Sequence, residues 1–182
     1  MLAEGETRQD GTFDLSFSNE RTPGYYLEVV ASQESENVRQ TVKSDVDRVY
    51  MVRSAGTIDE SVESDKTGVV IVAPASGAGP AFNIFDMGVA GATLVRTMLG
   101  AAPPHLDWLW TRGKKGTCPG DVTCYVSPQH ISVLSTQADP DEYDDMVLLH
   151  HYGHFFQALY ARTDSPGGGH TAPSRVGPRL GW

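Results

Sequence analysis

Histidines are concentrated near the end of the chain, where residues 148–170 read "LLHHYGHFFQALYARTDSPGGGH" and hold four of its six histidines. His150 and His154 are four residues apart, and residues with this spacing lie one above the other on the same face of a helix. Two imidazoles placed in this way can bind one metal ion, and Zn²⁺ accepts imidazole nitrogen readily. The spacing therefore predicts a zinc site at this pair, completed by further ligands from elsewhere.

His170 is the first candidate for a further ligand, because it follows the run "SPGGG", whose glycines allow a loop to fold back toward the helix. The predicted metal set is therefore His150, His154 and His170, with an exposed loop position as the alternative for His170. His151 is rotated about 100° from the pair around the helix. It could be a ligand, a substitute base or an exposed side chain, and the exposed position is the expected one.

Acidic residues precede this helix, and negative charge is favourable at a helix N-terminus. They are Asp141, Glu142, Asp144 and Asp145. Helix capping is therefore their expected role, although Asp144 or Asp145 could also orient a ligand imidazole.

The elements that must position these residues differ between the two parts of the chain. Apolar and polar residues alternate in "GTFDLSF", "GYYLEVVAS" and "RVYMVRS", as is typical of short strands. We therefore predict a small antiparallel β unit over residues 1–65, with "DESVESDKTG" as the link out of it.

Residues 66–182 carry a mixed pattern. The continuous apolar run "GVVIVAPA" predicts a strand, and apolar residues at intervals of three and four predict a helix over residues 81–99. Three further strands are expected in "LDWLW", "VTCYVS" and "ISVLST", before a helix that includes residues 148–160. His105 is expected to end a turn and His130 to begin a strand. The predicted fold class is α+β.

Charge and hydropathy exclude some functions. The net charge is −9 and basic residues cluster only weakly, at Arg112, Lys114 and Lys115, which disfavours nucleic-acid binding. No run approaches the ~18 apolar residues of a membrane span, and "MLAEGETRQDG" lacks the pattern of a signal peptide. Cys118 and Cys124 flank a Pro-Gly-Asp turn that could bring them within bonding distance in an oxidising compartment; two reduced thiols are an equal alternative.

The segment "DEYDDMVLLHHYGHFFQALYARTDSPGGGH" resembles the active-site segment of a bacterial family of gluzincin-type zinc metallopeptidases, whose helix carries His-Glu-Tyr-Gly-His. Upstream, "FNIFDMGVAGA" resembles the backing helix of the same family. The resemblance covers roughly residues 67–182 and implies a zincin-like half-domain with a mixed sheet, a backing helix and an active-site helix. It also implies a peptide or protein substrate, a secreted or cell-envelope location, and an edge strand near "DVTCYVS" that holds the substrate.

The chain departs from this family in two places. The general-base glutamate is replaced by His151, and the sequence stops at "GPRLGW", before the Glu-Gly-Trp segment that supplies the family's third zinc ligand. The metzincin pattern is excluded, because Gln157 and Tyr160 occupy its glycine and histidine positions. The expected function is a zinc metallopeptidase-like domain with impaired hydrolysis. The alternatives are a noncatalytic module (a pseudoenzyme) that binds a protein, peptide or glycan, and a three-histidine hydrolytic site.

Overall fold

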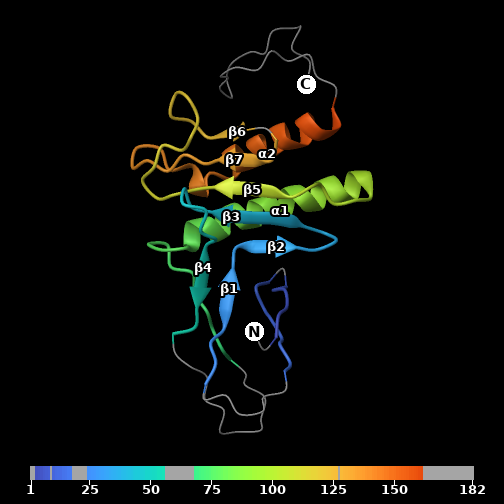
Figure 1. Ribbon diagram of the computed structural model, residues 1–182, viewed down its shortest axis with the longest axis vertical. Coiled ribbons are helices and arrows are strands. Elements are labelled where there is room, and N and C mark those ends of the chain that lie inside the picture. Colours follow the sequence, from blue (N-terminus) through green and yellow to red (C-terminus); the bar gives the residue numbers. More distant parts are fainter. Residues whose placement is uncertain (1–2, 9, 18–23, 56–67, 127, 162–182) are drawn as a thin grey trace.

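The computed structural model of this protein describes residues 3–8, 10–17, 24–55, 68–126 and 128–161. Within these residues the chain forms a mixed five-stranded sheet, an antiparallel two-stranded sheet and two α-helices (Figure 1). This composition confirms the predicted α+β class.

The five-stranded sheet has the spatial order β2 (Ser32–Glu34), β3 (Arg39–Lys43), β5 (Leu106–Leu109), β7 (His130–Ser132) and β6 (Cys124–Val126). The three central strands β3, β5 and β7 are parallel. The strands β2 and β6 lie at the two edges and run antiparallel to their neighbours. The predicted strand in "VTCYVS" is thus an edge strand.

A separate antiparallel ribbon is formed by β1 (Glu28–Val30) and β4 (Met51–Arg53), and Figure 1 shows it extending away from the larger sheet. The larger sheet, however, takes β2 and β3 from before residue 65 and its other three strands from after it. The division into residues 1–65 and 66–182 stays a prediction, but the five-stranded sheet crosses that boundary.

Both predicted helices are present, as α1 (Gly79–Leu99) and α2 (Asp145–Tyr160). Helix α1 begins with Pro80 in its first turn and ends at Gly100, whose φ of 76° is the left-handed conformation that glycine adopts easily. The two helices pack on each other and on one face of the five-stranded sheet (Figure 1). None of the helices in the described ranges has the length and apolar character required to cross a membrane.

The core between sheet and helices is organised by a row of residues that are register neighbours across four strands. Val42, Trp108, Ile131 and Tyr125 are successive partners in β3, β5, β7 and β6. The first three are fully buried, and Tyr125 packs on Phe155 of α2. The row therefore faces the helices and determines how close they lie to the sheet.

Helix α1 is held against this sheet by a buried amide. Gln40 of β3 donates from Nε2 to the Phe85 carbonyl at 2.8 Å and accepts from Trp108 Nε1 at 3.1 Å. A Cβ on Gly88 would lie 1.9 Å from Gln40 Oε1, so only glycine permits this approach of α1 to the sheet.

Two predicted strands are wrong and two observed strands were not predicted. Residues 11–17 and 68–75 contain no strand in the described structure, and Val70 and Val72 are exposed. A continuous apolar run forms a buried strand only where layers cover both of its faces, and here alternate residues are open to solvent. The sequence does not predict strands β2 and β3, because "SQE" and "RQTVK" are mostly polar. These two strands are stabilised by the strands beside them in the sheet.

Candidate metal centre

Helix α2 begins at a well-formed cap. The short 3₁₀ helix η1 (Asp141–Tyr143) precedes it, and the carboxylate of Asp144 accepts from the backbone N–H groups of Met146 and Val147, both at 3.1 Å. The predicted capping role is confirmed for Asp144. Because an N-cap satisfies backbone donors that have no partner within the helix, it fixes the first turn of the segment that carries the histidines.

The inner face of α2 consists of Leu148, Tyr152 and Phe155, all of them buried. Tyr152 lies directly against α1, where a Cβ on Gly91 would be 2.6 Å from its ring. This stripe packs into the core and leaves the adjacent face of α2, with its histidines, toward solvent.

The histidines of α2 come together as the helical spacing predicts. His150 Nε2 and His154 Nε2 are 3.1 Å apart, and the ring centroids are 4.7 Å apart. Two nitrogen ligands of a tetrahedral Zn²⁺, each at about 2.0–2.1 Å from the ion, are about 3.3 Å apart. The observed separation is close to that value, so the pair can share one ion with little movement.

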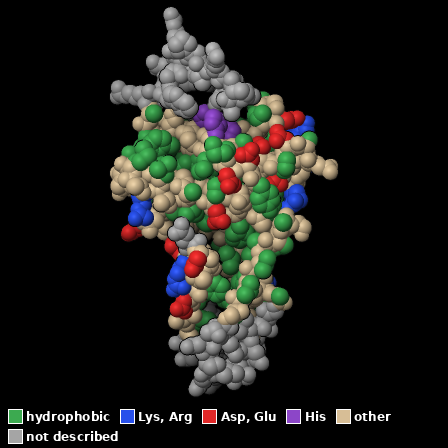
Figure 2. Space-filling view, turned by 180° about the vertical axis from the view of Figure 1, so that it is seen from behind, with side chains coloured by type: hydrophobic (Ala, Val, Ile, Leu, Met, Phe, Trp, Pro, Cys, Tyr) green, Lys and Arg blue, Asp and Glu red, His purple; other side chains and the backbone are tan. Residues whose placement is uncertain are grey.

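His151 belongs to the same cluster. Its ring centroid is 5.1 Å from that of His150 and 5.6 Å from that of His154. One nitrogen from each of the three rings can be chosen so that all lie within 4.8 Å of one another, and the three residues could hold a metal ion. Figure 2 shows histidine side chains gathered in one patch of the surface.

The expectation that His151 is exposed is wrong, since it is half-buried, as is His154, whereas His150 is exposed. The Cα–Cβ bonds of successive helical residues do point about 100° apart, but a long side chain can turn back toward a neighbouring ring. Sequence spacing gives the direction of the Cα–Cβ bond and not the position of the imidazole.

His170, the third predicted ligand, lies outside the described residues, as does the whole "SPGGGH" segment. Its role stays a prediction. Of the two other histidines, His130 has its expected position at the start of a strand, whereas His105, expected to end a turn, lies in a segment without an assigned turn. His130 begins β7, and His105 precedes β5, where its nitrogens contact Glu34 at 2.7 Å and Asp107 at 3.1 Å.

The other acidic residues before the helix do not act as caps. Asp141 is buried and accepts from Thr123 Oγ1 at 2.6 Å, while buried Glu142 accepts from Ser135 Oγ at 2.9 Å. Burial raises the pKa of Asp141, although the hydrogen bond from Thr123 opposes this shift. Asp145 accepts from Asn83 of α1 at 3.2 Å. These residues connect the helix start to its surroundings.

Gly153 lies beside the cluster on the exposed face of α2. A glycine inside a helix suggests that another group approaches the backbone closely, but a Cβ added here would meet nothing within 4 Å. Among the described residues the space over Gly153, the neighbour of His154 in the sequence, is open, which leaves room for a ligand.

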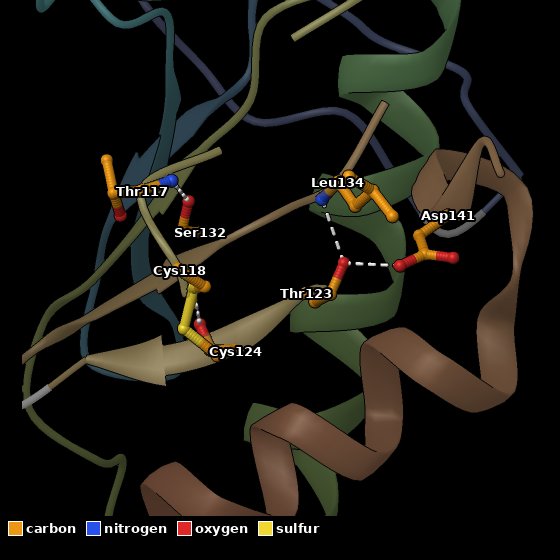
Figure 3. Close-up of a disulfide and its surroundings, with 7 residues drawn as sticks. All are labelled: Thr117, Cys118, Thr123, Cys124, Ser132, Leu134 and Asp141. Carbon is orange, nitrogen blue, oxygen red and sulfur yellow. Dashed lines mark hydrogen bonds between the residues drawn. A yellow bond between two sulfur atoms is a disulfide. The ribbon is translucent and has the colours of Figure 1, made fainter. Parts of the chain in front are cut away.

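The edge strand β6 lies next to this helix. Its Tyr125 ring is 6.0 Å from the ring of Phe155, which adjoins His154 in the sequence. A disulfide joins Cys118 to Cys124 at the start of the strand, so the alternative of two reduced thiols does not apply to this structure (Figure 3). A histidine cluster in which His150 is exposed thus lies near a strand whose outer edge has no neighbour in the described sheet.

Comparisons of this chain with protein-family models, with curated protein sequences and with solved structures find no match.

Proposed function

We propose that this chain is a zinc metallopeptidase-like domain in which the helix α2 holds the metal through His150 and His154. The observation that carries the proposal is the 3.1 Å separation of the two Nε2 atoms, one helical turn apart on a capped helix. The zincin-like character is supported by a mixed sheet with an antiparallel edge strand and two helices on one face.

Zinc is the proposed ion because the donor set consists of imidazole nitrogens, which suit Zn²⁺ better than Ca²⁺ or Mg²⁺. When bound, zinc supplies Lewis-acid chemistry, polarising a carbonyl group and activating water. A third protein ligand would come from His151, which lies in the cluster, or from His170, as the sequence predicts.

The position after the first ligand is where the resembled peptidases carry their general base, and here it is His151. A glutamate at this position is an anion that takes a proton while it remains attracted to the metal. An imidazole that takes the same proton becomes a cation beside a dication and is repelled by it. Peptide hydrolysis by the usual route is therefore expected to be severely impaired.

The proposed ligand is a peptide or protein. Backbone groups on the outer edge of β6 face away from β7 and can pair with an extended chain, as in strand addition. Because β6 also packs on α2 through Tyr125, a peptide on this edge would run close to the histidine cluster. The disulfide favours an oxidising compartment, consistent with a secreted or cell-envelope location.

A noncatalytic binding module is the second candidate, and the surface of α2 favours it. Met146, Leu149 and Tyr160 are exposed by 77%, 37% and 45% on the helix that carries exposed His150. Exposed apolar side chains beside an inactive centre are suited to binding a protein partner without turnover.

Metal analysis combined with peptide hydrolysis separates the two. The purified chain, His151→Glu and the control His130→Gln are compared for zinc content and for cleavage of a mixed peptide library. One zinc per chain, with cleavage appearing only in His151→Glu, supports the disabled peptidase. Absence of zinc from every variant, with no cleavage after the change to glutamate, supports the binding module.

A further inference from the structure

The edge strand β6 holds the metal helix at two places, through residues on the face of the strand that points to the helices. Thr123 immediately precedes the strand, and its hydroxyl donates to Asp141 Oδ2 at 2.6 Å and accepts from the Leu134 N–H at 2.8 Å (Figure 3). Thr123 and Asp141 are buried, so water does not compete for this contact. A hydrogen bond to a buried carboxylate is among the stronger ones in a protein.

Asp141 connects this hydrogen bond to the start of α2. Its carbonyl accepts from the N–H of Asp144 at 3.0 Å, and Asp144 in turn caps the helix. Thr123 is therefore one of the contacts that fix where the first turn of α2 begins, beside the hydrogen bonds of Ser135 to Glu142 and of Asn83 to Asp145. His150 follows Asp144 by six residues, which is less than two helical turns.

The second place is Tyr125, whose ring packs on Phe155. Thr123 and Tyr125 are two residues apart, so in a strand they point to the same side. Together they fix α2 before His150 and just after His154. The metal pair lies between two contacts made by one strand.

The strand that makes these contacts is itself weakly held. It has three residues and, among the described strands, is hydrogen-bonded to β7 alone. Cys124 lies between Thr123 and Tyr125 and points to the opposite side, where the disulfide joins it to buried Cys118. The loop before the strand is fastened to β7 by the Thr117 N–H, which donates to Ser132 Oγ at 2.9 Å (Figure 3).

We propose that Thr123 is a positioning residue for the metal helix, and that the Cys118–Cys124 disulfide makes this positioning sensitive to thiol reduction. The inference rests on the proposed metal site. In the reduction step a dithiol gives two electrons and two protons. The sulfur–sulfur bond breaks, Cys118 and Cys124 become thiols, and the dithiol closes to its own disulfide. Among the described strands, β6 is then held only by its pairing with β7, so Thr123 and Tyr125 are fixed less firmly and the constraint on α2 beside the histidines weakens.

The test uses zinc titration calorimetry on the full chain, with serine in place of both cysteines to represent the reduced state, because free thiols would bind zinc themselves. Thr123→Val and the Cys118→Ser/Cys124→Ser variant are expected to bind zinc about tenfold or more weakly, as removal of groups that orient metal ligands commonly does. Thr123→Ser keeps the hydroxyl and should retain the affinity. The control Ile131→Val trims the buried core beside β6 without touching Thr123 or the disulfide.

Hydrogen exchange provides the second measurement, because a variant that merely loses stability exchanges faster everywhere. In Thr123→Val and in the double serine variant, the amides of residues 146–150 should exchange faster while those of α1 keep their protection. The inference is overturned if zinc affinity in these variants equals that of the unmodified chain, or falls equally in Ile131→Val. It is overturned equally if both helices lose protection together. Failure of the unmodified, oxidised chain to bind zinc would instead refute the proposed metal site.

Discussion

Gly91 and Gly153 offer two identical substitutions with opposite expected effects. Both glycines lie inside α-helices, where alanine is favoured over glycine by about 1 kcal/mol. At Gly153 the added Cβ meets nothing within 4 Å, so Gly153→Ala is expected to stabilise the protein by about that amount. At Gly91 the Cβ would lie 2.6 to 2.8 Å from three atoms of the Tyr152 ring.

Tyr152 cannot move aside easily. It is 4% exposed, stacks on Trp108 with centroids 6.3 Å apart, and contacts Phe155 at 5.5 Å. Overpacking of this kind costs up to about 3 kcal/mol, and the helix preference of alanine offsets about 1 of it, so Gly91→Ala is expected to destabilise by about 2 kcal/mol.

Urea denaturation followed by tryptophan fluorescence measures both variants against the unmodified chain. The midpoint should fall for Gly91→Ala and rise for Gly153→Ala, with similar slopes. Two midpoints that rise together would show that α1 and α2 do not approach each other as closely as the structure places them.

Three further predictions test other contacts by the same assay. Asp144→Ala removes the cap of α2 and should lower stability by about 1 kcal/mol, whereas Asp144→Asn should keep most of it; equal losses would argue against the cap. Gly88→Ala should cost about 3 kcal/mol, because its Cβ would lie 1.9 Å from an oxygen of Gln40, which is buried and held by two hydrogen bonds; a neutral result would contradict that packing. Burial raises the pKa of Tyr152, so its hydroxyl keeps the proton to a higher pH in the folded state than in the unfolded state. Stability should therefore fall as the pH rises above 10. Tyr152→Phe removes a buried hydroxyl that has no hydrogen-bond partner in the described structure, so this variant should be at least as stable as the unmodified chain near pH 7. It should also lose less stability at alkaline pH; an unchanged loss would show that another group causes it.

The parts of the fold that follow from sequence are those with a strong local signal. Helix α1 has apolar residues every three or four positions between a proline and a glycine, and both of its limits were predicted to within two residues. Strand β3 has no such signal, because Gln40 and Thr41 are polar yet buried, and their burial depends on residues distant in the sequence. Tertiary context overrides the local pattern there.

The same distinction applies to the site. The pairing of His150 with His154 depends only on helical geometry, and the structure confirms that the two side chains meet. The inclusion of His151 depends on side-chain rotation, which spacing does not specify. The contact of Asp141 with Thr123 joins residues 18 apart and could not be read from a run of acidic residues that also looks like a cap.

Zinc binding by the unmodified chain and by variants of each histidine tests the central claim most directly. Calorimetric titration should give one zinc per chain, and His150→Ala or His154→Ala should each reduce the affinity by about 100-fold or more, whereas the control His130→Gln should not change it. A chain that binds no zinc, or one whose affinity survives the loss of both His150 and His154, would contradict the account.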